Sequence, residues 1–121
     1  MNLGGGIGFW IRDNIEFEHI NSPFIAKQIE TATIKLPKLN SIIINVYRPF
    51  GDVNKFIADL TTHIKCLRKD YARYNICVAG DFNINLLTDT EESRSLIETF
   101  TLEGFIQTVT LPTRIMGQQR H

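Results

Sequence analysis

The chain is organised around one stretch, Ile76-Cys77-Val78-Ala79-Gly80-Asp81-Phe82-Asn83. Four apolar residues run without a break into a glycine, which is typical of a short strand buried on both faces. Side chains alternate along a strand, so we expect Asp81 and Asn83 on one face at its end and Phe82 on the other. A carboxylate and an amide would then lie where α/β sheets bind ligands. Because Asp and Asn also favour turns, a purely turn-forming role is the alternative.

Length, charge and cysteine content narrow the class of protein. The 121 residues leave room for one domain with a hydrophobic core. Thirteen basic and thirteen acidic residues cancel, so no net charge draws the whole chain to nucleic acid or to an anionic membrane. The sequence has no apolar run of membrane-spanning length and no signal-peptide pattern. Cys66 and Cys77 lack a metal-ligand spacing, and we expect both near the core of an intracellular protein, in the cytoplasm or nucleus.

Four strands are expected before the first helix. Gly4-Gly5-Gly6 is interpreted as a turn into a strand at 7–11, because neither the Walker nor the dinucleotide spacing of glycines is present. Residues 15–18 alternate as a half-buried strand does. Residues 26–36 and 42–47 are rich in β-formers and flank a turn signal, which predicts a hairpin.

Two helices are expected in the rest of the chain. Asp52 can cap a helix that runs to about Tyr71, with apolar residues at 3–4 spacing over five turns. Its basic residues between 65 and 73 are interpreted as a solvated face, although they could also approach a phosphate backbone. Either Thr88 with Glu91 or Asp89 with Glu92 predicts a capping box for a second helix that Gly104 ends. A last strand at 105–111 would complete an α/β layered domain.

Two further motifs flank the central stretch, which itself continues from Gly80 to Leu87. Upstream is Asn45-Val46-Tyr47-Arg48-Pro49, and downstream is Leu111-Pro112-Thr113-Arg114. In this order the motifs resemble the endonuclease/exonuclease/phosphatase family. More narrowly, the chain is similar to the endonuclease domain of non-LTR (LINE-type) retrotransposons, whose glycine-rich strand matches residues 4–8. The resemblance implies an incomplete four-layer α/β sandwich over residues 1–121.

The resemblance also implies a reaction and its participants. The reaction is hydrolysis of a DNA phosphodiester that depends on Mg²⁺ or Mn²⁺, with a reverse transcriptase region as neighbour in a polyprotein. Asp81 corresponds to the aspartate that orients or deprotonates the attacking water, and Asn83 to the amide that steadies the phosphate and the surroundings of Asp81. Tyr47 corresponds to the tyrosine whose hydroxyl contacts the phosphate. Arg48, by its charge, and Arg114 are assigned to substrate binding. Another phosphoesterase of the same family is the alternative.

The chain departs from the family pattern at both ends. The family's principal metal ligand, a glutamate on an early strand, has no counterpart here. His121 is not preceded by an aspartate, so the family's final Asp–His pair has none either. We therefore assign no metal ligand, except that Asp81 could serve as an outer one. We expect this fragment to be weak or inactive alone, with exposed sheet edges that favour aggregation. The alternative is a non-catalytic relic of a mobile element.

Overall fold

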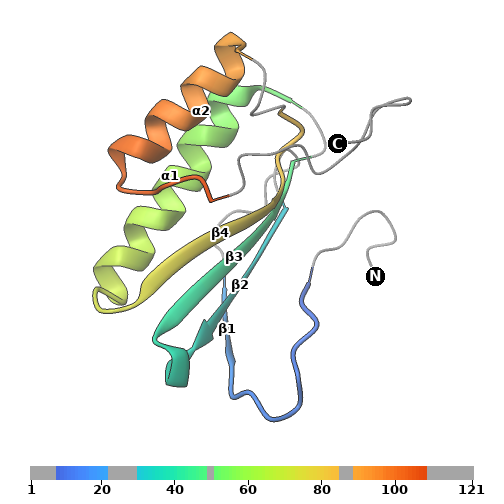
Figure 1. The fold of residues 1–121 in the computed structure, drawn as a ribbon, viewed down its shortest axis with the longest axis vertical. Helices are drawn as coiled ribbons and strands as arrows, with labels where there is room; N and C mark the ends of the chain where they lie inside the picture. The colour runs from blue at the N-terminus through green and yellow to red at the C-terminus, as the bar shows by residue number, and fades with distance from the viewer. Residues whose placement is uncertain (1–7, 22–29, 49–50, 85–88, 109–121) are drawn as a thin grey trace. The chain divides into compact units, whose positions relative to one another are not determined.

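The computed structural model describes residues 8–21, 30–48, 51–84 and 89–108. Over these residues the chain is mixed α/β, with a four-stranded mixed sheet and two α-helices (Figure 1). The chain divides into two compact units, Met1–Asn83 and Ile84–His121. The sheet and the first helix belong to the first unit, and the second helix belongs to the second. The expected α/β class is confirmed, and the expected single domain over 1–121 stays a prediction.

The sheet has the strand order β1-β2-β3-β4. Its strands are β1 (Glu18–Ile20), β2 (Glu30–Leu36), β3 (Ser41–Tyr47) and β4 (Asn75–Asp81). The first three pair antiparallel in sequence order, and β4 pairs parallel with β3. Between β2 and β3, the 3₁₀ turn η1 (Pro37–Leu39) ends at Asn40 in the left-handed conformation, with a φ of 54°. The pairing of β2 with β3 confirms the predicted hairpin, and residues 26–29 of its predicted first strand lie outside the described ranges. Asparagine tolerates the left-handed conformation of the turn better than most residues.

The parallel pairing of β3 and β4 requires a crossover, and helix α1 (Val53–Asp70) provides it. The Asp52 side chain caps α1 by accepting a hydrogen bond of 2.9 Å from the backbone N–H of Asn54. The predicted cap and span are confirmed. So is the apolar stripe, whose buried members are Val53, Phe56, Ile57, Leu60, Ile64 and Leu67. Buried apolar area of this kind is the main source of helix stability in a protein.

His63 extends the buried stripe of α1, although the sequence assigned it no role. The side chain is 1% exposed, and its Nε2 lies 3.0 Å from Oγ1 of Thr33 on β2. This contact places α1 against one face of the sheet, as Figure 1 also shows. Burial lowers the pKa of His63, because the charged imidazolium loses its hydration.

Alternation along the strands divides β3 and β4 into two faces. The helix face carries Ile42, Ile44 and Val46 of β3, each 0% exposed, in register with Ile76, Val78 and Gly80 of β4. The open face carries Ile43, Asn45 and Tyr47 in register with Cys77, Ala79 and Asp81. All three β4 residues of the open face are exposed. The expectation that β4 is buried on both faces is therefore wrong for the described chain, because the apolar run is covered on one side only.

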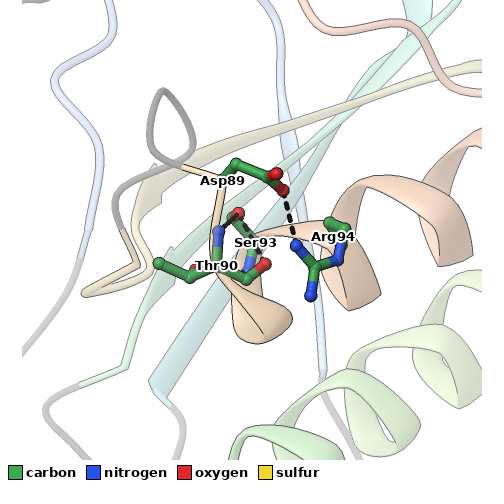
Figure 2. A network of polar contacts seen from close by, with 4 residues as sticks. All are labelled: Asp89, Thr90, Ser93 and Arg94. Atoms are coloured by element: carbon green, nitrogen blue, oxygen red, sulfur yellow. Dashed lines mark hydrogen bonds and ion pairs between the residues drawn. The ribbon is translucent and has the colours of Figure 1, made fainter.

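The second helix, α2 (Glu91–Leu102), begins with a hydrogen-bonded cap. Figure 2 shows that Thr90 and Ser93 bond reciprocally: Thr90 Oγ1 accepts from the Ser93 N–H at 3.1 Å, and Ser93 Oγ accepts from the Thr90 N–H at 3.0 Å. Asp89 instead pairs with Arg94 at 2.7 Å. Both predicted capping boxes are wrong in position, because a serine hydroxyl here plays the part expected of a glutamate. Gly104 follows the helix at a φ of 90°, so the predicted end is confirmed.

Several smaller expectations are also corrected. Residues 8–11 and 105–108 form no strand, and the remaining residues of those two predicted strands lie outside the described ranges. The strand expected at 15–18 begins only at Glu18. Cys66 and Cys77 are both exposed, on the outer side of α1 and on the open face of the sheet respectively. In the described part of the chain, neither helix has the length and apolar character needed to cross a membrane.

Candidate functional site

The candidate site lies at the carboxyl ends of the two parallel strands. Tyr47, the last residue of β3, is the register partner of Asp81, the last residue of β4. Register partners on adjacent strands have Cα atoms about 5 Å apart and side chains on the same face. Tyr47 is 37% exposed and Asp81 is exposed, so solvent reaches both side chains. Tyr47 and Asp81 belong to separate sequence motifs, but they are neighbours on the open face of the sheet.

A tight turn follows Asp81 and fixes its carboxylate. Asp81 Oδ1 accepts a hydrogen bond of 2.9 Å from the backbone N–H of Asn83. Asn83 adopts the left-handed conformation with a φ of 54°, which its short polar side chain tolerates. Phe82, between them, packs its ring 5.9 Å from that of Phe56 on α1. The predicted alternation is thus observed for Asp81, on the open face, and Phe82, on the helix face, whereas Asn83 already lies in the turn beyond the end of β4.

Gly80 lets β4 approach β3 closely just before this turn. Its φ is 134°, a conformation that side-chain-bearing residues rarely adopt. A Cβ atom on Gly80 would lie 1.9 Å from the backbone oxygen of Val46, well inside van der Waals contact. Steric constraints therefore explain why the sequence motif has glycine at position 80, because only glycine permits this pairing immediately before Asp81.

Arg48 is buried beneath the turn and is only 5% exposed. Its Nε donates to the Phe82 carbonyl at 2.8 Å, its Nη2 to the Asn83 carbonyl at 3.2 Å, and its Nη1 to the Gly51 carbonyl at 2.9 Å. The amide Nδ2 of Asn83 donates in return to the carbonyl of Arg48. Contact between Arg48 and substrate stays a prediction. What the structure shows is that the guanidinium binds the carbonyls of the turn.

The other predicted site elements are less complete. Arg114 lies outside the described residues. Among the residues described, no three histidine, cysteine, aspartate or glutamate side chains come together in a group that could hold a metal ion. Asp81 is the one carboxylate at the turn itself, and the described donors do not by themselves fit the expected Mg²⁺ or Mn²⁺, which needs several oxygen ligands.

One neighbour of the site was not anticipated from the sequence. Glu30, the first residue of β2, is the antiparallel register partner of Tyr47, so Glu30, Tyr47 and Asp81 form one row across three strands. Strand spacing puts the Cα atoms of Glu30 and Asp81 about 10 Å apart, on either side of the tyrosine. Only the hairpin register could have revealed this row, and a one-residue shift would have removed it.

The site thus contains an exposed carboxylate held by a turn, an exposed tyrosine beside it, and a buried arginine below. The carboxylate can accept a proton, and the tyrosine hydroxyl can donate a hydrogen bond to an anionic oxygen. The turn and the strand pairing hold these two groups in a fixed relative position. Comparisons with known proteins add no assignment: no protein-family model, curated protein or solved structure matches this chain.

Proposed function

We propose that this chain carries part of a phosphodiesterase site, belonging to a metal-dependent DNA endonuclease of the endonuclease/exonuclease/phosphatase type found in non-LTR retrotransposons. The observation that supports it most is the register of Tyr47 with Asp81 at the carboxyl ends of β3 and β4. The motif resemblance assigns both residues to one phosphate, and that assignment requires them to be neighbours. An incomplete four-layer α/β sandwich is the fold that goes with this proposal.

In the proposed reaction, Asp81 holds the attacking water and takes up its proton. Its Oδ1 is engaged by the Asn83 N–H, and a carboxylate has acceptor sites on both oxygens to spare for water. The Tyr47 hydroxyl donates to a phosphate oxygen, where negative charge develops. Asn83 acts by steadying Asp81, since its N–H donates to Asp81 Oδ1 and its side-chain amide donates to the carbonyl of Arg48.

The described residues supply one carboxylate at this position, so no metal-dependent step is assigned to them. Further metal ligands would have to lie outside the described ranges or on another chain. The proposal keeps the expectation that the 121-residue chain has weak activity or none. A non-catalytic relic of a mobile element is the alternative.

The test is nicking of supercoiled plasmid by the purified chain with Mg²⁺ or Mn²⁺, compared with Asp81→Ala and Tyr47→Phe. We expect at most slow nicking, which Asp81→Ala abolishes. Tyr47→Phe should lower the same rate about 10²-fold, the usual effect of removing one donor to a developing negative charge.

Three outcomes separate the alternatives. Nicking that persists unchanged in Asp81→Ala would refute the proposed site. Complete inactivity of the wild type would favour the non-catalytic relic. Rapid nicking that depends on Asp81 would support the site and show that the expected weakness is wrong.

A further inference from the structure

We propose that Arg48 is a positioning residue for Asp81: its buried guanidinium locks the Asp81–Asn83 turn and so sets the direction of the carboxylate. The importance of this role for chemistry rests on the proposed function. The role itself concerns the turn alone, so it can be tested without turnover. It differs from the expectation that Arg48 binds a substrate phosphate.

The guanidinium of Arg48 is bonded to two separate segments. Its Nε and Nη2 donate to the carbonyls of Phe82 and Asn83, on the turn after β4. Its Nη1 donates to the carbonyl of Gly51, just before α1. Three nitrogens in a rigid planar fork can reach three carbonyls that lie in different directions, whereas lysine carries its three N–H donors on one nitrogen atom.

Aromatic packing holds the guanidinium in this place. Cζ of Arg48 lies 5.6 Å from the ring centroid of Phe56, which is 0% exposed. Phe82 packs against the same ring at 5.9 Å. A cation over an aromatic face is favourable, and more so when it is shielded from water. Arg48, Phe56 and Phe82 therefore form one packed unit below the turn.

The main chain of Arg48 is part of the same arrangement. Its N–H donates to the Asp81 carbonyl at 2.9 Å, and its carbonyl accepts from Nδ2 of Asn83. These bonds hold Asn83 in the left-handed conformation, and from there the Asn83 N–H reaches Oδ1 of Asp81. The direction of the Asp81 carboxylate thus depends on these main-chain bonds together with the bonds from the Arg48 guanidinium to the carbonyls of Phe82 and Asn83.

A phosphate-binding role would place different demands on Arg48. An arginine that binds backbone phosphate has to present its donors to solvent, whereas this one is 5% exposed and directs three nitrogens at carbonyls. Moving the side chain out to a phosphate would leave the Phe82 and Asn83 carbonyls without these bonds. The observed contacts therefore favour positioning.

The first test follows the Asn83 backbone amide by ¹H–¹⁵N NMR during a pH titration of the full chain. Because this N–H donates to Asp81 Oδ1, its chemical shift reports protonation of that carboxylate. We expect Arg48→Met and Arg48→Lys to reduce the titration amplitude at Asn83 by at least half. The exposed Arg12 provides the matched control, and Arg12→Met should leave the amplitude unchanged.

Signals from α1 and the β2–β3 hairpin show in the same spectra whether each variant is folded. An unchanged Asn83 titration in a folded Arg48→Met or Arg48→Lys variant would overturn the proposal. If both variants unfold, the wild type still decides, because a buried and bonded Arg48 Nε–H should exchange with water much more slowly than that of Arg12. Equally fast exchange would overturn the proposal.

The second test measures binding of a short DNA duplex at several salt concentrations. Loss of a phosphate contact lowers the slope of log affinity against log salt by about one. A positioning role predicts the same slope for wild type and the uncharged variant Arg48→Met, and a slope lower by about one would overturn it. If the wild type binds no DNA, the proposed function loses support, while the Asn83 titration still decides the role of Arg48.

Discussion

The two faces of β3 and β4 share one backbone and differ in almost everything else. On the helix face, Ile42, Ile44 and Val46 are each 0% exposed, and α1 covers them. On the open face, the β4 side chains are exposed, and the two strands end there in Tyr47 and Asp81. One face holds the sheet and α1 together, and the other carries the candidate site.

This difference shows where the chain tolerates change. Apolar side chains on the helix face interlock with those of α1, so a change of volume there alters close packing. The β4 side chains on the open face contact water, so replacing Cys77 or Ala79 should change little that folding depends on. The candidate site connects the two faces, because Asp81 lies on the open face while Arg48 and Phe82 anchor its turn against α1.

The largest effect should come from Gly80→Ala, on the helix face. The new Cβ would lie 1.9 Å from the Val46 oxygen and 2.7 Å from the Val46 nitrogen, so backbone would have to move. Positive φ and overpacking each cost about 1–3 kcal/mol, and we expect the free energy of unfolding to fall by about 4 kcal/mol. Urea unfolding measures it.

Gly8→Ala is the matched control for that substitution, since nothing lies within 4 Å of a Cβ at Gly8. It should change the free energy of unfolding by less than about 0.5 kcal/mol. Equal losses at the two glycines would show that the close approach of β4 to β3 is not what makes Gly80 necessary.

A smaller contrast should appear between Leu60→Ala and Cys77→Ala. Leu60 of α1 is 0% exposed beneath the helix face, and its truncation should cost about 3 kcal/mol. Cys77 is exposed on the open face, and its truncation should cost less than about 0.5 kcal/mol. Thermal and urea unfolding of both variants compare the faces directly. A cost of 2 kcal/mol or more at Cys77 would mean that something covers the open face.

The smallest effect concerns pH and His63. Burial lowers its pKa in the folded chain below the ordinary 6.5, so the unfolded chain binds more protons in the window just below 6.5. Stability should therefore fall as pH drops through 6.5 towards the folded-state pKa, and become independent of this group below it. Urea unfolding between pH 7.5 and 5 measures this loss.

The comparison with His63→Gln isolates the contribution of that imidazole from other titrating groups. As pH falls, the free energy of unfolding of the wild type should decrease relative to that of His63→Gln. If the difference in free energy of unfolding between wild type and His63→Gln does not change with pH, the inference that His63 is buried in its neutral form is wrong.

The sequence predicts best those elements whose signals are local. Helix α1 follows from its cap at Asp52 and its 3–4 spacing, and the hairpin turn follows from the residues around Asn40. The left-handed conformation of Asn83 and its bond to Asp81 agree with a turn-forming role, which is the alternative that the sequence offers for these two residues. Both readings of Asp81 and Asn83 are therefore compatible, since the same turn that caps β4 also directs its carboxylate.

The sequence predicts poorly whatever depends on distant partners. An apolar run such as that of β4 shows that one face is buried but does not tell what covers the other, so Cys77 was misplaced. The charge of Arg48 suggested a phosphate, whereas its bonds to Phe82 and Asn83 link residues 34 and 35 apart. At the start of α2, the Thr90–Ser93 pair lacks the acidic residue of the usual capping signature.

The crossover through α1 also has a consequence for the order of folding. The β2–β3 hairpin closes through a short local turn, whereas β4 can join β3 only after the whole of α1 has been spanned, at a greater cost in chain entropy. The pairing of Tyr47 with Asp81 and the bonds of Arg48 belong to this late step. We expect native-state hydrogen exchange to protect the hairpin amides more than those of Arg48 and Asn83. The candidate site would then be assembled last and lost first.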